Sequence, residues 1–241
     1  MKDKREAEAT NVQGTRNVLE LMRELGIPKG VYTSTLGVNE DTGGQLVDET
    51  HRYTGPYFSE YTRTKAEAHR LAETFIADGL PLVIVMPGLI YGPGDTSSVR
   101  TTLLQYLQRQ LPMIPRQSAF CWAHVDDIAR AHILAMEKGT PGQTYIIAGP
   151  MHTFVEGMKL AEQITGIPSP RTAPAGLFKV MSAVMGVVEK IIPVPEAYTR
   201  KFINLIKNLL HAGLMEDWKF QKTYSGVPQG AICSPILANV C

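Results

Sequence analysis

Tyr61 and Lys65 are the residues whose types and spacing most directly suggest chemistry. Two side chains four residues apart on a helix share one face and lie about one turn apart. An ammonium group near a phenol favours the phenolate, which lowers the tyrosine pKa from about 10 towards neutral pH. Such a tyrosine can pass a proton to or from a carbonyl or hydroxyl group. The pair is a candidate for general acid–base catalysis, and an exposed helix with a solvated lysine is the structural alternative.

Two apolar segments flank this pair and give it a structural setting. Upstream, residues 30–35 have the pattern of a buried strand and end in two neighbouring hydroxyl side chains, Ser34 and Thr35. Downstream, residues 82–88 form a second apolar run that ends in Pro-Gly. Successive side chains on a strand point to opposite faces, so we expect only one of the two hydroxyls to serve a common site. The structural alternative is a hydroxyl that caps the backbone at the strand end.

Helical and strand-like segments alternate along the chain. Amphipathic spacing predicts helices, and short apolar runs predict strands. The predicted helices span residues 18–25, 60–77, 99–110, 126–137 and 154–164, the predicted strands 30–33, 82–85 and 144–148, and the predicted loops 39–54 and 111–119. This alternation predicts an α/β fold with a parallel sheet that helices cover on both faces.

The order of these motifs resembles the extended short-chain dehydrogenase/reductase family, also called the NAD-dependent epimerase/dehydratase family. Residues 11–19 resemble its helix before the hydroxyl strand, residues 124–131 its later V-D-D-x-A helix start, and residues 142–149 the strand that follows. The resemblance covers residues 1–198, which we predict to be one NAD(P)-binding domain. It implies a partial Rossmann-like parallel sheet with flanking helices and a small C-terminal helical cap over residues 155–195.

The resemblance also implies a reaction, namely reversible hydride transfer between NAD or NADP and a carbinol carbon. In the family's pattern Tyr61 moves the hydroxyl proton, Lys65 tunes that tyrosine and binds the nicotinamide ribose, and Thr35 orients the substrate oxygen. Thr35 is favoured over Ser34 because it aligns with the family's catalytic hydroxyl. The implied substrate is a small alcohol or ketone of the sugar-nucleotide, steroid-like or flavonoid-like kind. A reductase or epimerase outcome ranks above a dehydratase, because no acidic residue directly follows Thr35.

Pro87, Gly88 and Leu89 follow the second strand, where the family brings backbone against the nicotinamide. A simple strand terminator is the alternative. Met86 stands where the family often has arginine, so no anion-binding role is expected at that position.

Asn11 is a candidate supporting residue that would hydrogen-bond towards the site. Thr10 with Gln13 also has the spacing of a helix capping box, which makes a structural role the alternative for this segment.

His124 with Asp126 and Asp127 could suggest a metal site, but the two acids more simply cap the following helix. We therefore predict no metal.

The glycine-rich turn that binds a pyrophosphate in this fold is not found after any early strand. The chain begins where the family's fourth strand–helix unit would be, so we expect a truncated domain whose first strand is an unpaired edge. Impaired turnover, or an inactive gene remnant, is the expectation that follows.

The last part of the chain, residues 199–241, has a different character. Residues 225–239 resemble the S-G-x-P-Q-G-x-x-x-S-P-x-L-A-N segment of group II intron reverse transcriptases. The metal-binding aspartates of a polymerase lie in other motifs, so we expect a fragment without polymerase activity. An intron-derived, nucleic-acid-binding fragment is the second alternative for the chain's function.

The composition is that of an ordinary soluble globular protein, with 44% hydrophobic and 20% charged residues in 241. A net charge of +1 supplies no field for nucleic acid or an anionic membrane. The chain has no long apolar segment or signal peptide, and its three cysteines are few and odd in number, so we expect a cytoplasmic protein without a membrane partner. A homo-oligomer is left open.

Overall fold

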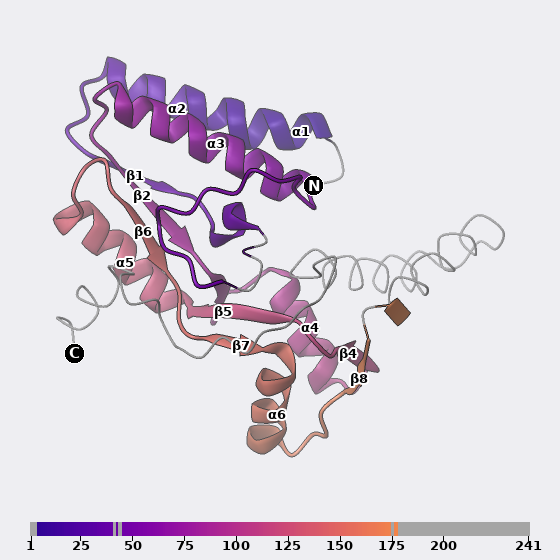
Figure 1. Cartoon of the computed structure of the whole chain (residues 1–241). Helices are drawn as coiled ribbons and strands as arrows, with labels where there is room; N and C mark the ends of the chain where they lie inside the picture. The colour runs from indigo at the N-terminus through magenta and orange to yellow at the C-terminus, as the bar shows by residue number, and fades with distance from the viewer. Residues whose placement is uncertain (1–3, 41, 43–44, 175, 178–241) are drawn as a thin grey trace. The chain divides into compact units, whose positions relative to one another are not determined.

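The computed structural model describes residues 4–40, 42, 45–174 and 176–177, which fall into two compact units (Figure 1). Of these residues, the first unit contains 4–92 and 121–150, and the second contains 93–120 and 151–177. The predicted tail domain, residues 199–241, lies outside the described residues, as does the predicted cap beyond residue 177.

A parallel sheet forms the centre of the first unit. Its strands are β1 (Gly30–Thr33), β2 (Leu82–Pro87) and β6 (Thr144–Ile147), in the order β1-β2-β6. Both pairings are parallel, with Gly30 opposite Leu82 and Ile84 opposite Thr144. All three predicted strands are therefore confirmed, and so is the α/β class with a parallel sheet. Among the described residues β1 lies at the edge of this sheet.

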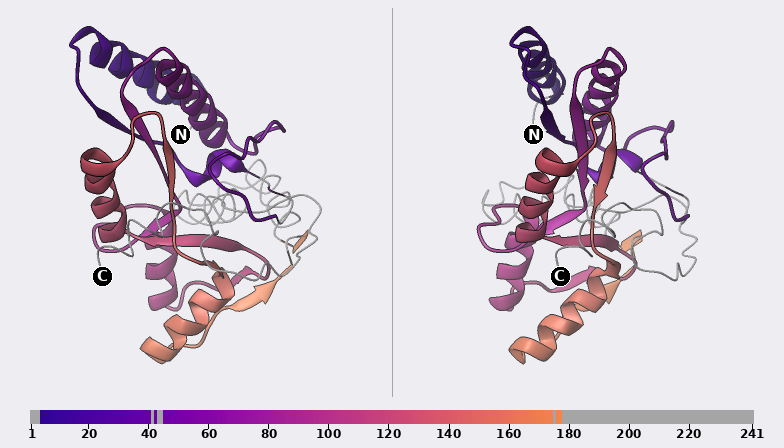
Figure 2. Two further views of the ribbon diagram at one scale, coloured as in Figure 1. Left: turned by 60° about the vertical axis from the view of Figure 1, so that its left-hand side comes forward. Right: turned by 90° about the vertical axis from the view of Figure 1, so that its left-hand side faces the viewer.

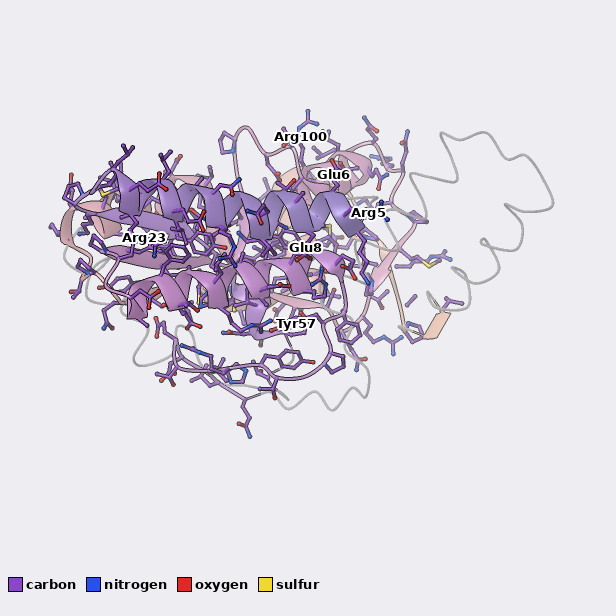
Figure 3. The ribbon with its side chains drawn as sticks, turned by 90° about the horizontal axis from the view of Figure 1, so that it is seen from above. Arg5, Glu6, Glu8, Arg23, Tyr57 and Arg100 are labelled. Carbon is purple, nitrogen blue, oxygen red and sulfur yellow. The ribbon has the colours of Figure 1, made fainter. Side chains whose placement is uncertain are left out.

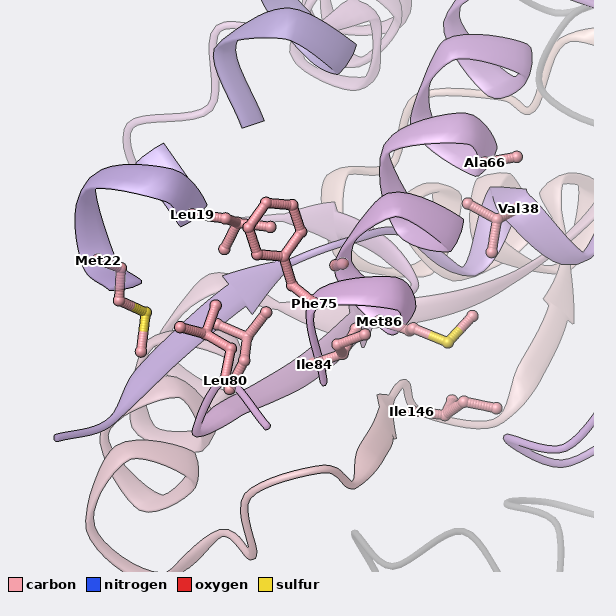
Figure 4. Packing of buried hydrophobic residues seen from close by; sticks show 11 residues of the cluster. Leu19, Met22, Val38, Ala66, Phe75, Leu80, Ile84, Met86 and Ile146 are labelled. Atoms are coloured by element: carbon pink, nitrogen blue, oxygen red, sulfur yellow. The ribbon is translucent and has the colours of Figure 1, made fainter. Parts of the chain in front are cut away.

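Strand β2 is buried along its whole length because helices cover both faces of the sheet. Its even-numbered apolar residues pack with Leu19 and Phe75 in one cluster (Figure 4), and its odd-numbered ones pack with Ile128 in another. Helices α2 (Gly14–Glu24) and α3 (Glu60–Ala77) lie on one side, and α5 (Val125–Lys138) on the other (Figure 2). A continuous apolar strand with alternating partners is the expected signature of a doubly covered parallel sheet.

The helix that precedes β1 is continuous from α1 (Lys4–Glu8) into α2, through a π-helical segment at Ala9–Gln13. This continuity contradicts the capping box predicted for Thr10 and Gln13: the backbone is already helical there, so no free helix start needs capping. The Gln13 side chain instead donates a 2.7 Å hydrogen bond to Asn17.

Ion pairs tie α1 to α3. The Arg63 guanidinium bonds to Glu60 and Glu67 on its own helix and to Glu8 on α1, and Figure 3 shows Glu8 between the two helices. Through Glu8, Arg63 connects α1 to α3, the helix that carries Tyr61 and Lys65.

The caps of the other helices show one further difference from the prediction. Ser59 caps α3 and forms a reciprocal capping box with Thr62. At α5, however, His124 is the N-cap and accepts the Asp126 N–H, so the prediction that Asp126 or Asp127 caps this helix is wrong. Both acids lie in the first turn, where their negative charges interact favourably with the positive end of the helix dipole.

The remaining elements include several short ones that the sequence pattern did not predict. In the first unit, a 3-10 helix at Leu36–Asn39 follows β1, and β3 (Leu89–Tyr91) pairs in parallel with β5 (Ala119–His124). The second unit contains α4 (Ser98–Leu107), β4 (Met113–Pro115), β7 (Met151–Thr153), α6 (Phe154–Thr165) and β8 (Arg171–Ala173). Strand β4 lies in the predicted loop 111–119 and pairs with β8. Helices α4 and α6 confirm the helices predicted there.

In the part of the chain that the structure describes, no helix has the length and apolar character that crossing a bilayer would need.

Candidate active site

Tyr61 and Lys65 lie on α3 opposite the end of β1. The Lys65 ammonium donates a 2.8 Å hydrogen bond to the Thr33 carbonyl oxygen, and it lies 5.1 Å from the centre of the Tyr32 ring. The Thr35 side chain lies within reach of the Tyr61 phenol, and its interaction with the phenol acts to lower the pKa of Tyr61. The structure thus brings together Tyr61, Lys65 and Thr35, which the sequence predicted as one site.

The two neighbouring hydroxyls have different partners. The Ser34 Oγ lies 2.8 Å from the Nδ1 of His69 and is buried, whereas the Thr35 Oγ1 accepts the Gly37 N–H at 3.2 Å and reaches Tyr61. Both hydroxyls therefore turn towards α3 or its start, and the predicted strand alternation does not separate them. The reason is that β1 ends at Thr33, so its period of two no longer applies. Of the pair, Thr35 is the hydroxyl that meets the tyrosine.

The electrostatics of the pair differ from the expectation that Lys65 lowers the pKa of Tyr61. Burial raises the pKa of the Tyr61 phenol above its ordinary value, and the hydrogen bond to Thr35 opposes this rise. Burial also lowers the pKa of Lys65. Tyr61 remains 49% exposed, so a ligand can reach it.

Pro87, Gly88 and Leu89 lie where β2 ends and β3 begins. The Gly88 N–H donates to the Ile147 carbonyl at 3.0 Å, and a Cβ atom at position 88 would come within 2.3 Å of the Cys121 carbonyl oxygen. The close approach of the β5 backbone is enough to require glycine here. Contact of this segment with a nicotinamide stays a prediction.

Asn11 lies in the π-helical segment and reaches α3. Its side-chain amide donates to the Thr64 Oγ1 at 2.9 Å, and Thr64 is fully buried next to Lys65 in sequence. The backbone carbonyl oxygen of Asn11 accepts a 2.6 Å hydrogen bond from the Thr15 hydroxyl. Single-turn π segments inside helices occur often at functional sites. The contact makes Asn11 a support for α3 beside Lys65.

His124 and Asp126 contact one another at the start of α5. The His124 Nδ1 accepts the Asp126 N–H and lies 3.6 Å from the Asp126 carboxylate. Within the described ranges, no three His, Cys, Asp or Glu side chains cluster as metal ligands would.

His69 and Glu73 are two residues of this region that the sequence analysis did not select. They continue the four-residue spacing of Tyr61 and Lys65 along α3, and His69 contacts Ser34 at the end of β1. That spacing was the available signal, because residues at i and i+4 lie on one helix face.

The described residues fit one end of a nicotinamide dinucleotide. The Lys65 ammonium has three donors and gives one to Thr33, and the adjacent Tyr61 is open to solvent at the carboxyl end of a parallel strand, where ligands bind in such sheets. The pyrophosphate end has no match in the described residues, since β1 leads into a 3-10 helix and a long loop rather than directly into a glycine-rich helix start.

Comparison with known proteins identifies the family of this chain. The sequence matches the NAD dependent epimerase/dehydratase family over residues 1–148. It is 31% identical over 176 residues to sterol demethylase protein B of Methylococcus capsulatus, a match that covers 71% of this chain and 53% of that protein. It is 32% identical over 161 residues to a decarboxylating sterol-4-alpha-carboxylate 3-dehydrogenase of Candida albicans, covering 61% of this chain and 45% of that one. The chain thus spans about half the length of these curated relatives.

A solved structure shows the same fold. The crystal structure of a nucleoside-diphosphate-sugar epimerase from Pseudomonas aeruginosa aligns with a TM-score of 0.68 at 18% identity, over 86% of this chain and 72% of that one. The expected nicotinamide cofactor is that of the family, which is NAD-dependent. From its sequence match and its fold, this chain belongs to the NAD dependent epimerase/dehydratase family.

Proposed function

We propose that this protein is an NAD-dependent oxidoreductase that acts on a hydroxyl or keto carbon, with Tyr61 as the proton-transferring residue. One observation carries the proposal: Tyr61 is 49% exposed, its phenol is within reach of the Thr35 side chain, and it lies one helical turn from Lys65. A phenol, a hydroxyl and an ammonium in this arrangement can hold and protonate a substrate oxygen.

The direction of proton transfer follows from the pKa of Tyr61. Burial raises that pKa, so the phenol holds its proton more firmly than an ordinary tyrosine and we assign it the role of proton donor to a ketone oxygen. Thr35 orients the same oxygen, and Lys65 supplies positive charge near the oxyanion that develops. A nicotinamide cofactor held beside Lys65 would supply the hydride that this reduction needs. We therefore write the proposed step as a reduction, in which the protonated phenol is the acid.

For the substrate class we favour a sterol-like or flavonoid-like alcohol or ketone over a sugar nucleotide. The support is that two relatives above 30% identity carry sterol names and a third, at 34%, carries a dihydroflavonol reductase name, whereas the sugar-nucleotide epimerase is similar at 18%. A hydroxyl on a rigid apolar skeleton is the chemistry we propose for the substrate.

A catalytically inactive chain that only binds is the second candidate. Its support is the path of the described chain, in which β1 leads into a 3-10 helix and not into a glycine-rich helix start whose backbone N–H groups would bind a pyrophosphate. A nucleic-acid-binding role rests on residues 199–241 alone. If that role is correct, we expect immobilised single-stranded RNA to retain the full chain at physiological salt and not to retain a variant that ends at Tyr198.

The test is a fluorescence titration of NADH and NADPH into the full chain, followed by turnover with sterol ketones. We expect saturable NADH binding, weaker binding in Lys65→Met, and turnover lost in Tyr61→Phe while binding remains. Lys29→Met is the matched control, since Lys29 also donates to a backbone carbonyl, that of Gly139, at 2.6 Å. No saturable binding would overturn the proposal in favour of the inactive chain.

A further inference from the structure

Four polar residues form a single column on α3. Tyr61, Lys65, His69 and Glu73 follow one another at four-residue intervals, so each lies about one turn from the next along a stripe that winds gradually around the helix. The first two belong to the proposed site. His69, in contrast, is 5% exposed and has no part in the proton transfer described above. The proposed proton transfer therefore does not account for this buried histidine.

His69 links the end of β1 to the rim of the first unit. Its Nδ1 lies 2.8 Å from the Ser34 Oγ, and its Nε2 lies 3.5 Å from the Glu73 Oε1. The Glu73 Oε1 in turn accepts a 2.6 Å hydrogen bond from Arg52. Ser34 and His69 are both buried, whereas Glu73 and Arg52 are progressively more exposed. The chain of contacts runs from the interior to the surface.

The carboxylate orients the imidazole. A negative group beside Nε2 favours the tautomer with its proton on that nitrogen, and this leaves Nδ1 free to accept the Ser34 O–H. The hydrogen bond between His69 and Glu73 is the main reason why the pKa of Glu73 lies below its ordinary range. A buried serine with one defined acceptor has one defined rotamer.

Ser34 occupies the position between two residues that hold the proposed site. Thr33 precedes it and binds the Lys65 ammonium through its carbonyl oxygen, and Thr35 follows it and bonds to Tyr61. The Ser34 N–H also donates to the Val85 carbonyl at 2.8 Å, which holds this residue against β2. Any rotation of the backbone at Ser34 would move the Thr33 carbonyl and the Thr35 hydroxyl together.

We propose that His69 is a positioning residue: through Ser34 it sets the backbone that places the Thr33 carbonyl on Lys65 and the Thr35 hydroxyl on Tyr61. Glu73 and Arg52 hold the imidazole in the required orientation. This inference rests on the proposed function for its catalytic meaning, but its structural consequence is measurable without turnover.

The test measures the titration of the Tyr61 phenol in the full chain by NMR, with [¹³Cζ]tyrosine and with Tyr61→Phe to assign the signal. In His69→Leu and Ser34→Ala we expect the Tyr61 midpoint to rise by about half a pH unit or more, because the hydrogen bond from Thr35 that lowers it is misaligned. His69→Asn should restore the wild-type midpoint, because an asparagine amide oxygen takes the place of Nδ1. Glu67→Gln, on another face of α3, is the matched control and should leave the midpoint unchanged.

Each outcome decides the inference. Unchanged Tyr61 midpoints in Ser34→Ala and in His69→Leu, together with a loss of thermal stability, would show a merely structural role and overturn it. Failure of His69→Asn to restore the midpoint would overturn it as well. If His69→Leu does not fold, Ser34→Ala and His69→Asn still decide. Where turnover is measurable, we expect kcat to fall in Ser34→Ala with KM little changed. Loss of all NADH binding would reject the proposed function and leave the NMR result valid.

Discussion

Gly88 lies directly against the backbone of Cys121. A Cβ atom on Gly88 would come within 2.3 Å of the Cys121 carbonyl oxygen and 3.0 Å of the Ala148 Cβ. Backbone carbonyls cannot turn aside as flexible side chains do, so the contact requires glycine. The relationship joins the loop after β2 to β5, which lies more than thirty positions later in the chain.

We predict that Gly88→Ala destabilises the protein by about 1–3 kcal/mol, the usual range for overpacking a tight contact. Gly14→Ala is the matched control, because Gly14 is in a helix and its new Cβ would meet its nearest neighbour, the Ala9 carbonyl, at an ordinary 3.6 Å. We expect that control to stabilise the protein by about 0.5–1 kcal/mol. Urea unfolding of the three proteins measures both effects, and equal midpoints for the two variants would contradict the packing argument.

Thr35→Val tests the hydroxyl that meets the tyrosine. We expect kcat to fall by about 10²-fold, since a misplaced substrate oxygen costs about that much. The pKa of Tyr61 should also rise further, because the hydrogen bond from Thr35 lowers it. Thr33→Val is the control: the Thr33 hydroxyl bonds to His132, and its carbonyl contact with Lys65 survives the change. Steady-state kinetics and the Tyr61 NMR titration give the answer, and a fall of similar size in both variants would argue against a specific role for Thr35.

Tyr32 predicts how the protein responds to alkali. Burial raises the pKa of its phenol to about 12. A raised folded-state pKa contributes stability that is fully present below the unfolded value of about 10 and is lost as pH rises through the folded value. Between about pH 10 and 12, we therefore expect the free energy of unfolding to fall by about 2 kcal/mol less in Tyr32→Phe than in the wild type. Urea midpoints across that interval test this, with pH 8 as the reference at which tyrosine ionisation contributes nothing. Parallel curves for the two proteins would rule the prediction out.

Glu73 predicts a loss of stability as the pH falls. Its hydrogen bond with His69, followed by nearby positive charges that include Arg52, holds its pKa below the usual range. A lowered folded-state pKa contributes stability that is present above the unfolded value and is lost as pH falls through the folded one. We expect wild-type stability to begin falling below about pH 4.3 and Glu73→Gln to show a shallower fall. Thermal midpoints from neutral to acid pH provide the measurement; an unchanged slope in the variant would contradict the role given to Glu73.

Much of the site could be predicted because its parts are local. The spacing of Tyr61 and Lys65 required only a helix between them, and the apolar runs at residues 30–33 and 82–85 required only their own composition to be recognised as strands. The contacts of Lys65 could not be predicted in the same way. Its ammonium turns to the Thr33 carbonyl, a partner 32 positions earlier, and no local pattern shows which acceptor a long side chain reaches.

The sequence by itself determined the α/β class, the helix that carries Tyr61, and the order along the chain of the apolar runs that form the parallel strands. These features could be recognised because periodicity and run length are properties of neighbouring residues. Tertiary structure alone decided the rest. The three-residue strands β3, β4 and β8 are too short for a pattern, and they exist through partners far along the chain. Likewise, Ser34 meets His69 rather than Tyr61 because β1 ends one residue before it. Pairing and close packing are non-local, so they appear only when the chain has folded.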